Sequence, residues 1–85
     1  MYTTYALYSK AFNKIYIGYT SDLEQRLNSH NITAKKGWTI KFRPWELLYS
    51  EEFMTKVESM KREKELKSSR GREFIWKIVN ERHVI

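Results

Sequence analysis

The sequence predicts an α+β fold in which a small three-stranded antiparallel sheet is flanked by about three helices. Two aromatic and β-branched runs near the N-terminus indicate strands, and apolar side chains at helical spacing near the C-terminus indicate helices. The chain also has only three Gly and one Pro in 85 residues, which favours a packed globule. The expected order is β-β-α-β-α-α. Residues 1–85 should form a single domain, because so short a chain can bury only one modest core.

The three strands are expected where aromatic and β-branched residues gather. Residues 2–8 are rich in Tyr and Thr, and residues 14–20 alternate apolar and polar side chains. Residues 9–13 offer turn-forming Ser and Asn side chains between these two runs, so a β-hairpin is expected. Residues 45–53 return to strand character and should add the third strand.

The three helices are expected from their caps and their apolar spacing. Thr20 or Ser21 can cap the first helix, which should end near Asn31. The second helix is expected over residues 55–66, with Thr as its N-cap, and the third over residues 69–82. The segment before the third strand, NITAKKGWTIKFRP, has four cations and no clear period, so it predicts an exposed, mobile basic loop.

The charge of the chain points to an anionic partner. Sixteen Lys and Arg oppose ten Asp and Glu, which gives a net charge of +6 that should attract phosphate backbones or anionic lipid. No apolar run approaches the roughly 18 residues of a membrane span. The absence of Cys excludes disulfides and cysteine zinc sites, and two histidines, His30 and His83, are too few for a His-rich metal site. A cytoplasmic protein without a membrane partner is expected.

Reactive side chains are concentrated in residues 16–30, YIGYTSDLEQRLNSH. On a helix, Arg26 and His30 flank the side that carries the two leucines of this segment, so they can border an anion pocket beside the strand tyrosines. The alternative is that Arg26 lays its stem on the core while His30 only complements the helix C-terminus. Gly18 weakens a strand unless a bulge, or a group lying close against the backbone, requires it.

These residues resemble the GIY-YIG nuclease superfamily. The resemblance rests on Tyr16-Ile17-Gly18, on Tyr5 eleven positions earlier, and on the later side chains Thr20, Leu23, Arg26 and His30. It covers nearly the whole chain, continues through a strand like ELLYSEEF and a Lys-rich helix, and fits the small stand-alone branch best. The chain departs from the first motif, where Thr3-Thr4-Tyr5 replaces Gly-Ile-Tyr.

The resemblance implies a metal-dependent endonuclease that hydrolyses DNA phosphodiester bonds, with branched or damaged structures in DNA repair or recombination as candidate substrates. It implies that Tyr5 and Tyr16 line the active site, that Arg26 contacts the scissile phosphate and that Glu58 holds one Mg²⁺ or Mn²⁺. His30 stands at a position that is His in some members and Tyr in others. The altered first motif favours an alternative, a catalytically inactive nucleic-acid-binding module of the same fold.

Two of these roles remain open at the level of sequence. A tyrosine near its reference pKa of about 10 is a poor base, so Tyr5 or Tyr16 would need a lowered pKa, with His30 assisting. Glu58 also completes a Thr-x-x-Glu capping box with Thr55, and capping explains this residue as well as metal binding does.

Two basic clusters are candidates for contact with DNA, and RNA is an open alternative. Cations and small polar residues suit phosphate contacts. Trp38 can stack on an unpaired base or can simply pin its loop to the domain. Because so small a domain buries little DNA, a homodimer or a partner protein is expected to supply specificity. The nucleic-acid-binding candidates are Lys35, Lys36, Trp38, Lys41, Lys67, Arg70 and Arg72.

Overall fold

The computed structural model describes residues 1–82, so His83 lies outside the described part of the chain. Its elements confirm the α+β fold and the β-β-α-β-α-α order. None of the helices within residues 1–82 has the length and apolar character needed to cross a membrane. The elements are β1 (Tyr2–Ser9), β2 (Lys14–Thr20), α1 (Leu23–Asn28), a π-helical turn (Ser29–Thr33), a 3-10 helix (Trp38–Phe42), β3 (Glu46–Phe53), α2 (Lys56–Lys67) and α3 (Ser69–Arg82).

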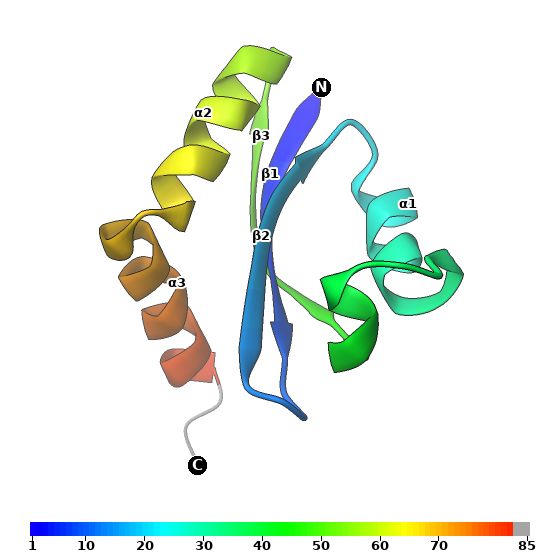
Figure 1. The fold of residues 1–85 in the computed structure, drawn as a ribbon. Helices are drawn as coiled ribbons and strands as arrows, with labels where there is room; N and C mark the ends of the chain where they lie inside the picture. Colours follow the sequence, from blue (N-terminus) through cyan, green and yellow to red (C-terminus); the bar gives the residue numbers. More distant parts are fainter. Residues whose placement is uncertain (83–85) are drawn as a thin grey trace.

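The sheet is antiparallel with β1 in the centre, in the order β2-β1-β3. Figure 1 shows α2 and α3 on one face of the sheet, and α1 with the two short helical turns on the other. Alternate residues of β1 therefore enter two cores. Ala6 and Tyr8 pack with Leu66, Ile75 and Val79 under α2 and α3. Tyr5 and Leu7 face the other side, where the buried Trp45 joins them.

The N-cap of the first helix lies one residue after Ser21 and two after Thr20, the predicted caps. Asp22 is the N-cap of α1, and its carboxylate accepts a hydrogen bond from the Gln25 backbone N–H at 3.1 Å. The Thr20 hydroxyl instead accepts from the Asp22 backbone N–H at 3.1 Å. The prediction of Thr20 or Ser21 as the cap was therefore wrong, because Thr20 shapes the turn that leads into the cap.

The expected basic loop is more structured than its composition suggests. The Arg43 guanidinium donates to three backbone carbonyl oxygens, those of His30, Ala34 and Ser29, at 2.6, 2.7 and 3.2 Å. Asn31 exchanges two side-chain hydrogen bonds with the backbone of Trp45, at 2.8 and 2.6 Å. The expectation of an exposed basic segment is confirmed for its lysines, but one inward-facing arginine and one asparagine tie the segment to the domain. The lysines of this segment do remain exposed.

Candidate active site

Tyr5 and Gly18 lie directly opposite each other on β1 and β2. The tyrosine ring covers the glycine so closely that a Cβ at position 18 would lie 2.7 Å from the Tyr5 hydroxyl oxygen. Real Cβ atoms essentially never show that separation, so only Gly fits beneath this ring. The expectation that something lies close against Gly18 is confirmed, and that group is the Tyr5 side chain.

His30 is buried between two hydroxyl groups. Its side chain is 4% exposed, its Nε2 lies 3.0 Å from the Tyr5 hydroxyl and its Nδ1 lies 3.1 Å from the Thr39 hydroxyl. The Tyr16 ring packs against the imidazole with 4.7 Å between ring centroids. A neutral imidazole carries one donor and one acceptor, so one hydroxyl donates to His30 and the other accepts from it.

The environment keeps both of these buried groups uncharged at neutral pH. Burial lowers the pKa of His30 to about 4, and the positive charges of Arg26 and Arg43 lower it further in the same direction. Burial raises the pKa of Tyr5 to about 12, although the nearby Arg26 guanidinium opposes that rise. Tyr5 therefore does not have the lowered pKa that a tyrosinate base would need, and His30 is held as the neutral imidazole.

Arg26 supplies a permanent positive charge on α1, facing both tyrosines. A hydrogen bond with the Tyr5 hydroxyl is the main cause that raises the pKa of Arg26, and the Tyr16 hydroxyl adds to it. The side chain is exposed on its outer side, so the guanidinium can meet a phosphate from solvent.

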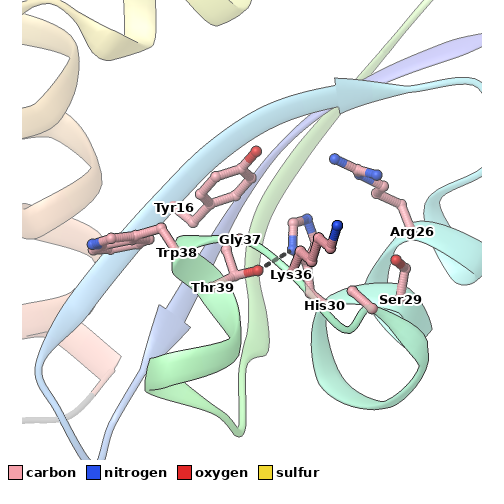
Figure 2. A pocket seen from close by; sticks show the side chains of 9 residues that line it. Tyr16, Arg26, Ser29, His30, Lys36, Gly37, Trp38 and Thr39 are labelled. Atoms are coloured by element: carbon pink, nitrogen blue, oxygen red, sulfur yellow. Dashed lines mark hydrogen bonds between the residues drawn. The ribbon is translucent and has the colours of Figure 1, made fainter.

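Two adjoining cavities meet at Tyr16 and Arg26, which line both of them. Figure 2 shows Arg26 and Trp38 on opposite sides of the first cavity, with His30 and Lys36 between them. The first has a volume of about 300 Å³ and is lined by Tyr16, Arg26, Ser29, His30, Ala34, Lys36, Gly37, Trp38 and Thr39. The second has a volume of about 340 Å³ and is lined by Tyr5, Tyr16, Gly18, Tyr19, Thr20, Arg26 and Glu63.

The carboxylate that lines these cavities belongs to Glu63, whereas the expected Glu58 lines neither of them. Glu63 is the only acidic residue that lines either of the two cavities. Glu58 lies at the start of α2, where its carboxylate accepts a hydrogen bond from the Thr55 hydroxyl at 2.9 Å and its N–H donates to that hydroxyl at 3.2 Å. Five residues separate the two glutamates, which places them about 140° apart around the helix. Glu58 therefore hydrogen-bonds to the N-cap Thr55 through both its backbone and its carboxylate, and it lines neither cavity.

The first motif is altered in sequence, but its backbone position is firmly held. Thr4 and Ser59 are both fully buried, and the Thr4 hydroxyl donates to the Ser59 carbonyl oxygen at 2.8 Å. The two hydroxyl oxygens also lie within hydrogen-bond distance of each other, at 2.9 Å. This contact fixes α2 on β1 one helical turn before Glu63. Nothing in the sequence marks Ser59 as buried, so sequence reasoning had no signal that favoured Glu63.

The basic candidates divide between the cavities and other surfaces. Lys36 and Trp38 line the first cavity, and Lys67 lies beside the second because it forms an ion pair with Glu63 at 3.4 Å. Arg70 and Arg72 line separate surface hollows on the α2 and α3 side of the sheet. The Trp38 ring packs on Phe42 of its own 3-10 helix at 4.6 Å and on the buried Trp45 at 5.8 Å, and the contact with Trp45 ties its segment to the domain.

The arrangement of two tyrosines around a buried glycine agrees with the comparison to known families. A family model described as the GIY-YIG catalytic domain matches residues 1–78. The chain belongs to the GIY-YIG family. It therefore has the nuclease-type fold of that family.

Several curated relatives carry the same GIY-YIG region. A UPF0213 protein of Staphylococcus haemolyticus is 39% identical over 70 residues, which cover 82% of this chain and 84% of the relative. A UPF0213 protein of Staphylococcus saprophyticus is 43% identical over 54 residues, covering 64% and 66%. The UPF0213 protein YazA of Bacillus subtilis is 43% identical over 51 residues, covering 60% and 52%. These relatives form a small stand-alone GIY-YIG family, as the motif predicted, and their names state no activity.

Proposed function

We propose that this chain is an endonuclease that hydrolyses phosphodiester bonds in DNA with the help of Mg²⁺ or Mn²⁺. One observation carries the proposal. Two phenols, a permanently charged guanidinium, a buried neutral imidazole and one carboxylate line two adjoining cavities on a GIY-YIG fold. These are the groups that phosphodiester hydrolysis needs, because it requires charge stabilisation at phosphorus, a proton acceptor and a group that stabilises the leaving oxygen.

Arg26 is the group that binds the scissile phosphate. It lines both cavities, so a phosphate at their junction would lie against its guanidinium. A guanidinium can pair two phosphate oxygens at once and stays charged at any working pH. In the transition state, its charge would stabilise the additional negative charge on the pentacovalent phosphorus.

Tyr5 and His30 together form the route for the proton. In this proposal the attacking water gives its proton to the Tyr5 oxygen while Tyr5 passes its own proton to His30 Nε2, 3.0 Å away. Hydroxide then attacks phosphorus, and His30 holds the proton as an imidazolium. The charge of Arg26 contributes to the low pKa of His30, so a bound phosphate that neutralises Arg26 would make the imidazole a better base.

Glu63 fits the requirements of a Mg²⁺ or Mn²⁺ site. Mg²⁺ usually keeps several waters and binds through one or two carboxylates together with substrate phosphates. One carboxylate in the cavity is therefore sufficient, which agrees with the lack of any cluster of three or more His, Asp or Glu suited to a metal within residues 1–82. When bound, such an ion supplies positive charge at the leaving 3′ oxygen. Lys67 would then give up its ion pair with Glu63.

Branched or damaged DNA in repair or recombination is the proposed substrate, because the chain offers a small basic surface and no separate module to read sequence. The net charge of +6 supports binding that weakens with rising salt. We propose that the chain meets this DNA in the cytoplasm. A homodimer or a partner protein would supply the specificity that one small face lacks.

Cleavage of labelled DNA tests the proposal. Linear, flapped and four-way DNA are incubated with the purified protein and Mg²⁺, Mn²⁺ or EDTA, alongside Arg26→Ala. We expect metal-dependent cleavage that Arg26→Ala reduces by at least about 100-fold, as is typical when a charge-stabilising donor is lost. Cleavage that survives in Arg26→Ala would point to a contaminating nuclease. Binding without cleavage by the unmodified protein would favour the inactive binding module instead.

A further inference from the structure

A ridge of aromatic side chains extends from the first cavity to the β1–β2 hairpin turn. This aromatic ridge consists of Trp38, Phe42 and Phe12. The Trp38 and Phe42 ring centroids lie 4.6 Å apart, and those of Phe42 and Phe12 lie 5.5 Å apart. Trp38 is 47% exposed and Phe12 is 50% exposed. The ridge therefore holds its rings in place by mutual contact and still offers two large aromatic surfaces to solvent.

The two segments that build the aromatic ridge carry only positive charge. Residues 9–21 and 29–45 contain six Lys and Arg and no Asp or Glu, although the chain has ten acidic residues elsewhere. Arg43 turns inward to the backbone carbonyls, which leaves five exposed lysines. One of them, Lys14, holds its ammonium 5.6 Å from the centre of the Phe42 ring. The five are Lys10, Lys14, Lys35, Lys36 and Lys41.

The aromatic ridge is continuous with the proposed cleavage site. Trp38 and Lys36 line the same cavity as Arg26 and His30. If a DNA strand binds with its scissile phosphate at Arg26, its neighbouring nucleotides would therefore contact Trp38 (Figure 2).

We propose that the aromatic ridge binds the bases of an unpaired stretch of DNA strand beside the scissile phosphate, while the surrounding lysines hold its backbone. This inference rests on the proposed nuclease function and extends it to a substrate class. Exposed rings among cations are what single strands require, because each base has a free face that can stack on an aromatic side chain. Paired bases inside a duplex already stack on each other, so a continuous duplex would gain only the lysine contacts.

Binding to a single strand without metal tests the inference independently of catalysis. The probe is a fluorescent oligo-dT of about ten nucleotides, a length within the range that one small domain covers. An abasic oligomer of the same length has the same phosphate charge but no bases. Fluorescence anisotropy is measured in EDTA on the Glu63→Gln background, so that a failure of cleavage does not affect the result. We expect oligo-dT to bind at least about 5-fold more tightly than the abasic oligomer, as one stacked base would provide.

Single substitutions then locate the base contacts. Trp38→Ala and Phe12→Ala should each reduce oligo-dT affinity by about 5-fold or more and leave abasic affinity unchanged. Phe74→Ala is the matched control, because Phe74 is 41% exposed but lies on α3 and packs against Tyr49. Circular dichroism checks folding, and Phe12→Ala, at the hairpin turn, remains informative if Trp38→Ala does not fold.

Two results would overturn the inference. Equal affinity for the oligo-dT and the abasic oligomer would show that the lysines alone bind the strand. A loss with Phe74→Ala as large as that with Trp38→Ala would show that the aromatic ridge has no special role. A preference for oligo-dT over the abasic oligomer that depends on Trp38 would support it even if no cleavage were ever observed.

Discussion

Acidification should destabilise this protein through His30. The imidazole is buried between the Tyr5 and Thr39 hydroxyls, with two arginines nearby, and its pKa is lowered to about 4 from an ordinary value of 6.5. The folded state therefore holds His30 neutral over a range of pH in which the unfolded chain protonates it. Because the unfolded state binds more protons in this range, His30 does not lower the free energy of unfolding above pH 6.5. The free energy of unfolding falls as the pH drops from 6.5 towards 4.

The magnitude follows from the two pKa values. At pH 8 the imidazole is neutral in both states and contributes no pH dependence. At pH 5 the unfolded imidazole is almost fully protonated and the folded one is mostly neutral. This pH lies about 1.5 units below the pKa of the unfolded imidazole. Each unit corresponds to about 1.36 kcal/mol, so the free energy of unfolding should fall by about 2 kcal/mol between pH 8 and pH 5. For a domain of this size, that lowers the melting temperature by roughly 8–16 °C.

Urea unfolding followed by circular dichroism at pH 8, 7, 6 and 5 measures this loss. The control is His30→Gln, which keeps hydrogen-bonding groups at the site but has no imidazole to titrate. The variant should have a lower free energy of unfolding at pH 8. Between pH 8 and pH 5 it should lose about 2 kcal/mol less of that free energy than the unmodified protein does. Parallel slopes in the two proteins, or an NMR titration of His30 with a pKa above 6, would refute the reasoning.

Three further substitutions probe the contacts that shape the site. Gly18→Ala should lower the free energy of unfolding by about 1–3 kcal/mol by overpacking against the Tyr5 ring, and it should also reduce cleavage. Urea unfolding measures the first effect and the DNA assay the second. Unchanged stability would contradict the close contact. Thr4→Val should lower the free energy of unfolding by about 1–3 kcal/mol because it removes the hydroxyl bound to the buried Ser59. Urea unfolding measures this loss. Unchanged stability would show that α2 is held by apolar packing alone. Arg43→Gln should lower the free energy of unfolding by at least about 3 kcal/mol, because three carbonyl oxygens lose a charged donor. Thermal unfolding followed by near-UV circular dichroism measures the loss. An unchanged melting temperature would refute this role.

Local patterns were sufficient to predict most of the fold. The third helix was expected over residues 69–82 and is observed at Ser69–Arg82, because its apolar spacing and its contacts with the sheet agree. The second strand was expected over residues 14–20 and is observed at Lys14–Thr20. In both cases the residues that decide the structure lie within one or two turns, or on the neighbouring strand, so the information is local.

The carboxylate of the site could not be predicted in the same way. Glu58 and Glu63 lie on one helix, and Glu58 has the stronger local signal because it completes a capping box with Thr55. What turns Glu63 towards the cavity is the contact of Ser59 with Thr4, which joins residues 55 positions apart. Periodicity along one helix cannot reveal how that helix docks on a distant strand.

The loop before β3 was predicted only in part, for a related reason. Its composition indicated an exposed basic segment, and four of its residues are indeed cations. Arg43 is one of them, yet it turns inward to three carbonyl oxygens and orders the turn that carries His30. A cation that caps backbone carbonyls has the same sequence signature as one that faces solvent.

We propose that Glu63, not Glu58, completes a metal-dependent cleavage site with Arg26 and His30. The most direct measurement compares single-turnover cleavage rates of Glu63→Gln and Glu58→Gln on the same DNA with Mg²⁺ or Mn²⁺. Gln can still serve in a capping box, so Glu58→Gln should keep its fold and a rate within about 2-fold of the unmodified protein. Glu63→Gln should lose at least about 100-fold, because it removes the cavity's carboxylate. Equal losses in the two variants, or a loss confined to Glu58→Gln, would contradict the account.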